Sequence, residues 1–364
     1  MPNDFSNSEL GKKLIVKVIE LAQQASNRLG RQLVLMEVCG THTVAISKSG
    51  IRSILASHME LRSGPGCPVC VTDQGDIDTV VEFSKIPGIT IATFGDMVRV
   101  PGTYSSLEKE RAHGASIEIC YSPHDALALA LKDTFREVLF LGVGFETTIP
   151  TVALTIASAH EQNIQNFSVF CIHKTIPPAM HVLLDDPELH IDGFILPGHV
   201  CTITGRHVFN FISSEYQIPA VITGFETIDI IHAIYLLLKQ ISEGTSRTEV
   251  GYTRLVHEEG NIKAKEMISE FFDPVDAPWR GFGSIPLSGL ALKSKYKHYD
   301  AAQRFPVQTP KSLPPDGCSC GEVLRGKFKP SDCPLFGVDC TPSTPIGPCM
   351  VSIEGSCAAH FQYD

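Results

Sequence analysis

The sequence lacks the features of several common functional classes. No apolar run approaches the roughly 20 residues of a membrane-spanning helix, and the start, MPNDFSNSEL, does not join a basic segment to an apolar one as a secretion signal does. Lys and Arg form no cluster, and a formal net charge of −10 disfavours a nucleic-acid surface. Neither a G-x-x-x-x-G-K-[ST] loop nor a clear G-x-G-x-x-G loop occurs, so no nucleotide bound by such a loop is expected. We therefore expect a cytoplasmic protein that acts away from membranes and nucleic acids.

Cysteine, in contrast, is abundant, with 12 residues in a chain of 364. Thiols stay reduced in the cytosol, where grouped cysteines more often bind metal or carry out redox chemistry than form structural disulfides. The three in the middle of the chain are expected to pack in cores. The twelve are Cys39, Cys67 and Cys70 near the start, Cys120, Cys171 and Cys201 in the middle, and Cys318, Cys320, Cys333, Cys340, Cys349 and Cys357 near the end.

Short apolar runs alternate with helical patterns along most of the chain. The runs are continuously apolar, as in parallel strands covered on both faces, and strand–helix alternation is typical of α/β folds. We predict two Rossmann-like units with mainly parallel sheets, plus a smaller Cys-rich iron–sulfur domain. The predicted strands are 33–38, 89–94, 137–143, 167–172, 193–196 and 220–223, and the predicted helices include 8–29, 122–132, 150–162 and 227–241.

Composition changes near residue 243, where polar and proline-containing stretches replace the apolar runs. A small domain there would lack a large core, so a metal cluster could stabilise it. A softer boundary lies near residue 130. The predicted domains are 1–45, a helix and strand leading to the Cys39 loop; 46–130, a first α/β domain with a C-x-x-C loop; 131–243, a second α/β domain; and 244–364, the C-terminal iron–sulfur cluster domain.

Polar, reactive residues follow the predicted strands, where open α/β sheets bind ligands. The acidic residues among them could orient groups or transfer protons, or cap the helices that follow. Gly-Phe-Glu-Thr occurs twice, at 144–147 and 224–227, which could reflect duplication, two similar turns or chance. The residues after the strands are Cys39, His42, Asp96, Glu146, His199 and Glu226.

The cysteines of the last fifty residues point to a metal site. Thiolates are the usual ligands of iron–sulfur clusters, which need four. Zinc takes four thiolates equally well, but structural zinc sites usually show paired C-x2–4-C knuckles. The closest pair here, Cys318 and Cys320, has one residue between its members. A third possibility is that these cysteines bind no metal.

The early cysteines allow several interpretations. Cys67-Pro68-Val69-Cys70 is a C-x-x-C segment, which could be a redox couple, half of a zinc site or two buried thiols. Cys39 precedes His42 by three residues, and both side-chain types bind iron well, although a lone Cys is more often a packed apolar residue. His42 could be a second ligand, a proton donor or a helix cap.

The ordered set of motifs resembles the HypD family of [NiFe]-hydrogenase maturation proteins over essentially the full length. Each motif is weak alone, and their order carries the resemblance. They are CGTHT at 39–43, GPGCPVC at 64–70, GDMVRVPG at 95–102, the two GFET segments, PGHV at 197–200, CPLFG at 333–337 and GPCMVS at 347–352.

The resemblance implies specific cofactors and roles. The family holds a [4Fe-4S] cluster through C-x12-C-x6-C-x16-C, which Cys320, Cys333, Cys340 and Cys357 match, leaving Cys318 and Cys349 to pack nearby. It implies that Cys67 and Cys70 form a redox-active pair that exchanges electrons with the cluster. It implies that Cys39 transiently holds an iron that receives cyanide and carbon monoxide, with His199 near this site. Glu354, three residues before Cys357, could tune the reduction potential of the cluster or help electrons pass.

The implied activity is that of a redox-active assembly scaffold rather than a simple turnover enzyme. The implied partners are a HypC-type small chaperone, a HypE-type cyanide donor with HypF upstream, and, indirectly, the hydrogenase large subunit. The alternative function is a free-standing iron–sulfur thiol/disulfide oxidoreductase. A zinc-stabilised binding module is a third possibility.

Overall fold

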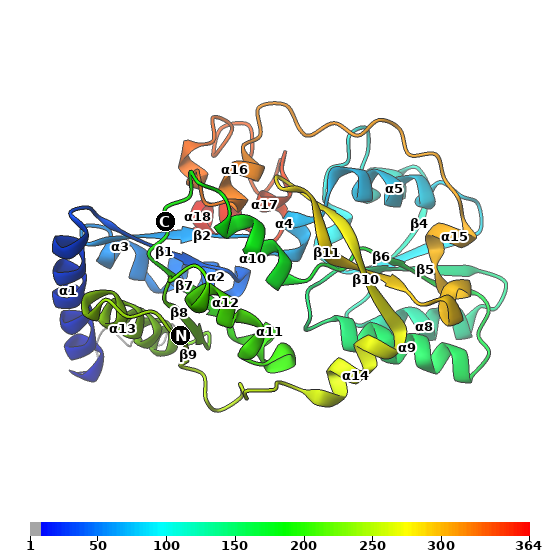
Figure 1. Cartoon of the computed structure of the whole chain (residues 1–364). Coiled ribbons are helices and arrows are strands. Elements are labelled where there is room, and N and C mark those ends of the chain that lie inside the picture. The colour runs from blue at the N-terminus through cyan, green and yellow to red at the C-terminus, as the bar shows by residue number, and fades with distance from the viewer. Residues whose placement is uncertain (1–8) are drawn as a thin grey trace.

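Two parallel β-sheets form the framework of the molecule, and the computed structural model describes residues 9–364 (Figure 1). All paired strands within both sheets run parallel, which confirms the predicted α/β class. The five-stranded sheet has the order β2 (Met59–Ser63), β1 (Leu33–Glu37), β7 (Gly193–Pro197), β8 (Ala220–Thr223) and β9 (Thr248–Val250). The four-stranded sheet has the order β4 (Ser116–Ile119), β3 (Ile89–Thr93), β5 (Glu137–Gly142) and β6 (Phe167–Cys171).

Helices cover both sheets. The two longest, α1 and α13, pack against each other beside the five-stranded sheet, and α8 packs on α9 beside the four-stranded sheet (Figure 1). The predicted helix over 8–29 is present as α1, apart from Ser8, which lies outside the described residues. The α-helices are α1 (Glu9–Leu29), α2 (Gly40–Ser49), α3 (Ile51–Leu55), α4 (Pro68–Val71), α5 (Gln74–Ser84), α6 (Gly95–Val98), α7 (Leu107–Ala112), α8 (Pro123–Lys132), α9 (Ile149–Glu161), α10 (Ile176–Leu184), α11 (Gly198–Thr204), α12 (Asn210–Ser214), α13 (Thr227–Glu243), α14 (Ile262–Phe271), α15 (Ala301–Arg304), α16 (Cys320–Leu324), α17 (Pro348–Val351) and α18 (Ser356–Tyr363). Short 3-10 helices are η2 (His207–Phe209), η3 (Ser294–Tyr299) and η4 (Pro330–Asp332).

Every strand predicted from an apolar run is present and ends within one residue of its predicted end. Three further strands of the two parallel sheets, β2, β4 and β9, have no counterpart among the apolar runs, and all three lie at sheet edges. An edge strand has one neighbour and part of its side chains faces outward, so MELRS, SIEI and TEV contain polar residues. Their sequences therefore do not stand out from loops.

The strand order cuts across the boundaries expected from the sequence. Strands β3 and β4, expected in a domain over 46–130, share a sheet with β5 and β6, expected in a domain over 131–243. Strands β1 and β2 instead complete the sheet that contains β7 and β8. The chain leaves the five-stranded sheet after β2, builds the whole four-stranded sheet and returns at β7. Strands that are neighbours in sequence are often neighbours in space, and this insertion departs from that tendency.

The last third of the chain reaches both sheets. Helix α14 packs on α9, and the antiparallel hairpin of β10 (Phe272–Trp279) and β11 (Gly283–Leu292) follows. After α15 the chain runs back over the top of Figure 1 to the Cys-rich segment, residues 318–357. In this segment and just beyond it, α17 packs on α4 and α18 packs on α2.

One hydrophobic core joins the two sheets to the Cys-rich segment. It contains Val34 of β1, Ile91 of β3 and Phe194 of β7 together with Cys340 and Cys349. Separate apolar clusters lie on the opposite faces of the four-stranded and five-stranded sheets. The Cys-rich segment is thus packed between the two α/β units through a shared core.

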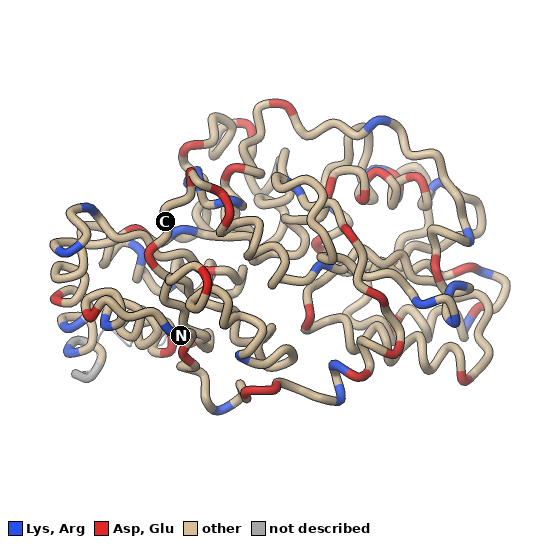
Figure 2. Tube along the Cα trace, viewed as in Figure 1, with Lys and Arg blue, Asp and Glu red and all other residues tan. Residues whose placement is uncertain are grey.

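Acidic and basic residues are interspersed along the chain in both units (Figure 2). Within residues 9–364, no helix combines the length and apolar character that crossing a membrane requires.

Candidate functional site

Cys39 lies where β1 ends and α2 begins, at the carboxyl edge of the five-stranded sheet. It is the N-cap residue of α2, and its side chain is half-buried. Its backbone N–H donates to Oε2 of Glu37 at 3.3 Å. Burial raises the pKa of the Cys39 thiol to about 12, and the negative charge of Glu354 adds to the effect. The free site therefore holds Cys39 as a neutral thiol.

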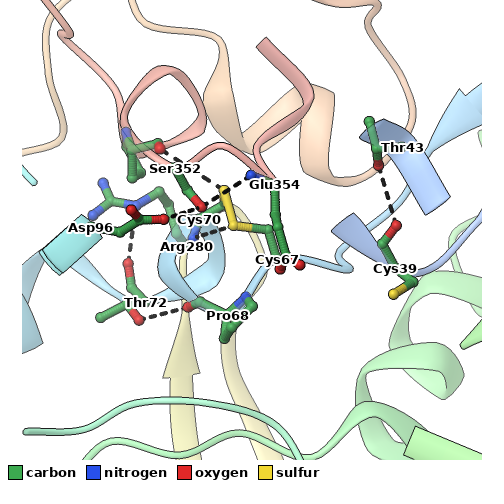
Figure 3. The surroundings of a disulfide bond; sticks show 11 residues. Cys39, Thr43, Cys67, Pro68, Cys70, Thr72, Asp96, Arg280, Ser352 and Glu354 are labelled. Carbon is green, nitrogen blue, oxygen red and sulfur yellow. Dashed lines mark hydrogen bonds between the residues drawn. A yellow bond between two sulfur atoms is a disulfide. The ribbon is translucent and has the colours of Figure 1, made fainter. Parts of the chain in front are cut away.

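Cys67 and Cys70 form a disulfide in the next loop (Figure 3). Their Cα atoms are 5.2 Å apart, and both residues are buried. Cys67 caps the four-residue helix α4, and its sulfur accepts the N–H of Cys70 at 3.2 Å. The sequence interpretation of Cys67 and Cys70 as a thiol pair close enough to bond agrees with this geometry.

Two glycines allow the Cys39 loop and the disulfide loop to touch. The N–H of Gly40 donates to the carbonyl of Gly66 at 2.9 Å. A Cβ on Gly66 would lie 2.2 Å from the backbone nitrogen of Cys39, and a Cβ on Gly40 would lie 2.6 Å from Cβ of Glu354. Three segments distant in sequence therefore meet backbone to backbone around Cys39.

A chain of hydrogen bonds connects this meeting point to Asp96. Thr41 Oγ1 donates to Glu354 at 2.7 Å, and the Glu354 N–H donates to Ser352 Oγ at 3.3 Å. Ser352 Oγ in turn donates to Asp96 at 2.8 Å. Figure 3 shows Cys39 on one side of the disulfide and Asp96 on the other. Asp96 and Glu354 thus both belong to the surroundings of the disulfide, whereas the sequence interpretation assigns Glu354 to the cluster.

His42 is fully buried in α2, three residues after Cys39. Its Nε2 lies 2.9 Å from the carbonyl oxygen of Gly224, so Nε2 carries the proton and Nδ1 is left with a lone pair. Nδ1 is buried and has no hydrogen-bond partner. Burial lowers the pKa of His42 to about 4. The neutral ring is thus unsuited to donating a proton from Nδ1 and suited to accepting a bond there.

His199 is exposed and stands at the start of α11, beyond the end of β7. The ring of Phe225 contacts both histidines, with centroids 3.9 Å from His199 and 4.6 Å from His42. Burial lowers the pKa of His199, and the charge of Glu354 acts in the opposite direction. Phe225 therefore joins His42 and His199 into one aromatic stack near Glu354.

The two Gly-Phe-Glu-Thr segments place their glutamates differently. Glu146 is buried and accepts the N–H of Ile176 at 2.9 Å, at the first turn of α10, while its second oxygen has no partner. Burial raises the pKa of Glu146 to about 7. Glu226 is exposed and makes no side-chain bond to α13. Gly144 has a φ of 147°, a conformation that favours glycine. The repeated letters therefore occupy different environments.

All six late cysteines line one cavity. Its remaining lining is largely apolar, and includes Val323, Leu335, Phe336 and Met350. The Cys340 sulfur accepts the N–H of Ile346 at 3.3 Å, a bond that favours a thiolate. Within residues 9–364, no three His, Cys, Asp or Glu side chains converge on the position of a single ion. The thiols surround one space from several sides. The six are Cys318, Cys320, Cys333, Cys340, Cys349 and Cys357.

The disulfide adjoins this cavity. The Cys70 sulfur lies 3.9 Å from the carbonyl oxygen of Pro348, and the neighbours of Pro348, Gly347 and Cys349, both line the cavity. Cys318 and Cys349, outside the sequence pattern, share the cavity with the four pattern cysteines. The three middle cysteines lie elsewhere: Cys120 and Cys201 are in hydrophobic cores, and Cys171 is half-buried beside His173.

Four residues of the site were given no role by the sequence analysis, although Phe225 and Ser352 lie within its GFET and GPCMVS motifs. Glu37 is buried at the end of β1, accepts Thr43 Oγ1 at 2.6 Å, and has its pKa raised by burial to about 7. Arg280, from the tip of the β10–β11 hairpin, donates to the carbonyl oxygen of Thr72. Phe225 and Ser352 complete the set. Glu37 could have been recognised from the sequence, because it is a charged residue at the end of an otherwise apolar strand.

Comparison with known proteins gives a consistent result. The model of the HypD family, described as "Hydrogenase formation hypA family", matches residues 12–364. A hydrogenase maturation factor HypD of Escherichia coli (strain K12) is 42% identical over 362 residues, covering 99% of this chain and 97% of the relative. The HypD of Rhodobacter capsulatus is 41% identical with the same coverage of each chain. A putative hydrogenase expression/formation protein of Methanocaldococcus jannaschii is 40% identical and covers 99% of both chains.

Proposed function

Because this chain belongs to the HypD family of hydrogenase maturation factors, we propose that it is a redox-active scaffold for the iron–cyanide–carbonyl unit of [NiFe]-hydrogenases. The observation that carries the proposal is the contact between the three segments that carry the thiol groups. Gly40 and Gly66 join the Cys39 loop to the disulfide loop, and Cys70 contacts Pro348 beside the cysteine-lined cavity.

Cys39 is the proposed anchor for the iron that is being modified. A thiolate makes Fe(II) electron-rich, which favours binding of cyanide and carbon monoxide. The thiol is neutral in the free site, so binding iron releases its proton to solvent. His42 presents an unpartnered Nδ1 lone pair, and the exposed His199 stands across Phe225. The two imidazole side chains are available to hold the iron or its incoming ligands.

The cysteine-lined cavity is proposed to hold the resident [4Fe-4S] cluster through Cys320, Cys333, Cys340 and Cys357. Its apolar lining and the N–H bond to the Cys340 sulfur support this assignment. When bound, the cluster would supply single electrons taken from a low-potential one-electron donor protein. The chain's own part is the Cys67–Cys70 disulfide, which becomes two thiols on accepting two electrons and two protons.

The partners proposed are those implied by the family. A HypC-type small chaperone would supply a second thiolate to the iron, a HypE-type protein charged through HypF would deliver cyanide, and the hydrogenase large subunit would receive the product indirectly. The half-buried Cys39 and the exposed His199 leave the iron side of the site open to such proteins.

The alternative, a free-standing iron–sulfur disulfide reductase, has less support. Both sulfurs of the disulfide are buried, with Cys67 exposed to 3% and Cys70 to 0%. A protein disulfide would have to reach a thiolate in the interior. The same burial suits a pair that stores electrons for a neighbouring site.

The infrared spectrum of full-length protein purified without oxygen, alone and with a HypC-type chaperone, tests the proposal. Bands in the cyanide and carbonyl region are expected in the parent protein, and their loss is expected in Cys39→Ser, with bound iron and sulfide of the cluster retained. Cyanide bands that persist in Cys39→Ser would refute the assignment of Cys39. Rapid turnover of disulfides by a protein without such bands would favour the reductase.

A further inference from the structure

Arg280 connects α4, the helix that contains Cys70, to the wall of the cysteine-lined cavity. It lies at the tip of the β10–β11 hairpin, and the neighbouring Gly281 packs directly on Gly321. A Cβ on Gly281 would lie 2.5 Å from the Cα of Gly321, the residue that follows Cys320. The hairpin tip therefore sits against the start of α16, where a proposed cluster ligand is located.

The side chain of Arg280 turns toward the end of α4. Its backbone N–H donates to the carbonyl of Val71 at 2.9 Å, and Nε donates to the carbonyl of Thr72 at 3.0 Å. Nη1 donates to Oε1 of Gln74 at 2.9 Å. Figure 3 shows Arg280 and Thr72 on the same side of the disulfide. One side chain thus binds the segment directly after Cys70.

The charge of Arg280 is buried without an anionic partner. The residue is 7% exposed, its Nη2 is buried with no hydrogen-bond partner, and its guanidinium makes no ion pair with any carboxylate of the described chain. The nearby carboxylate of Asp76 is bound to the buried Lys174 at 3.2 Å, and Asp73 caps α5. A buried charge is costly unless it is compensated. Apart from these carbonyl contacts and the more distant charge of Asp76, the described chain places no anion against the guanidinium.

We propose that Arg280 is the internal counter-cation of the bound iron–sulfur cluster and raises its reduction potential. The inference rests on the proposed function, since it takes the cavity beside Gly321 to hold a cluster. Four thiolates make such a cluster anionic, and reduction adds a further negative charge. A fixed cation beside it stabilises the reduced form more than the oxidised form, because net charge and nearby dipoles set the potential. Arg280 would not ligate the cluster and would act on its reduction potential through its charge.

Two substitutions isolate the charge from the packing. Arg280→Gln removes the cation, and Gln74→Glu keeps Arg280 and its hydrogen bond but adds a carboxylate at 2.9 Å from Nη1. Arg280→Lys preserves the charge. Arg325→Gln is the matched control. Arg325 also lies beside α16, as its C-cap residue, but it is half-exposed and paired with Glu322.

The measurement is an anaerobic spectroelectrochemical titration of full-length protein with its cluster, with iron and sulfide content determined for every variant. Arg280→Gln and Gln74→Glu should each shift the reduction equilibrium at least tenfold toward the oxidised cluster, or ~59 mV for one electron. Arg280→Lys and Arg325→Gln should stay near the parent value.

Parent-like potentials in both Arg280→Gln and Gln74→Glu at full cluster content would overturn the inference, as would an equal shift in Arg325→Gln. If Arg280→Gln does not fold, Gln74→Glu decides alone. A parent protein without iron–sulfur absorption would instead refute the proposed function, and the inference with it. The two failures are therefore distinguishable.

Discussion

Gly40 donates its backbone N–H to the carbonyl oxygen of Gly66 at 2.9 Å, and this bond joins two loops that lie 26 positions apart in the chain. One loop carries Cys39 and the other carries the disulfide. The contact is made between main chains, so it fixes the spacing of the two thiol groups more rigidly than side-chain contacts would. Any side chain at Gly66 would have to separate them.

Replacing Gly66 with Ala should therefore uncouple the two loops. The new Cβ would lie 2.2 Å from the Cys39 nitrogen, and backbone atoms cannot rotate away as a flexible side chain can. We expect a loss of stability of about 1–3 kcal/mol and loss of the cyanide bands, measured by chemical unfolding and infrared spectroscopy. Gly95→Ala is the control, because its Cβ would lie 3.8 Å from the nearest atom. Parent-like bands in Gly66→Ala would show that the spacing is not critical.

Iron binding at Cys39 should strengthen with pH. The pKa of the Cys39 thiol is raised to about 12, so binding iron must displace one proton at neutral pH, and affinity should rise about tenfold per pH unit. His42, with a pKa lowered to about 4, releases no second proton on binding. Anaerobic ferrous titrations at several pH values, with Cys39→Ala subtracted as background, measure the slope. An affinity independent of pH would contradict a neutral thiol as the anchor.

The cavity thiols should divide into four ligands and two bystanders. Serine at Cys320, Cys333, Cys340 or Cys357 should reduce bound iron and sulfide to background, because a [4Fe-4S] cluster needs four thiolates. Serine at Cys318 or Cys349, which line the same cavity, should leave a full cluster. Iron and sulfide analysis with the visible spectrum distinguishes the two groups. Retention of the cluster without Cys357, together with its loss without Cys349, would reassign the fourth ligand.

Glu146 should make the protein less stable as pH rises. Its pKa is raised from 4.5 to about 7 in the folded state, so between these values the folded chain binds more protons than the unfolded chain. The contribution of Glu146 to the free energy of unfolding falls by about 3 kcal/mol between pH 4.5 and about 7, at about 1.4 kcal/mol per pKa unit. The loss is complete above pH 7.

Unfolding of Glu146→Gln at pH 5 and pH 8 measures this term directly. The difference in unfolding free energy between the two pH values should shrink by about 3 kcal/mol in the variant, because glutamine does not titrate, while the similarly shifted Glu37 keeps its own share. Glu226→Gln, from the exposed copy of the same motif, should behave as the parent does. An unchanged difference between the two pH values in Glu146→Gln would rule out burial of a neutral carboxyl there.

Much of the secondary structure was accessible from the sequence, and the physical reason is burial. A strand covered on both faces is apolar along most of its length, so the strands predicted at 33–38 and 137–143 can be recognised from their sequence. The edge strands β2, β4 and β9 and the β10–β11 hairpin do not, because polar residues and prolines interrupt them. The hairpin escaped prediction for that reason, and Arg280 with it.

The sequence by itself determined the chemistry: thiols at 39, at 67 and 70, and in the Cys-rich segment, each beside glycines or prolines that let the backbone bend. It could not decide their arrangement, because the two sheets are interleaved along the chain and similar apolar runs suit either one. Only the tertiary structure placed Gly66 against Cys39, Pro348 against Cys70, and all six late cysteines around one cavity. These contacts join residues far apart in the chain, and such pairings depend on how the sheets pack rather than on local composition.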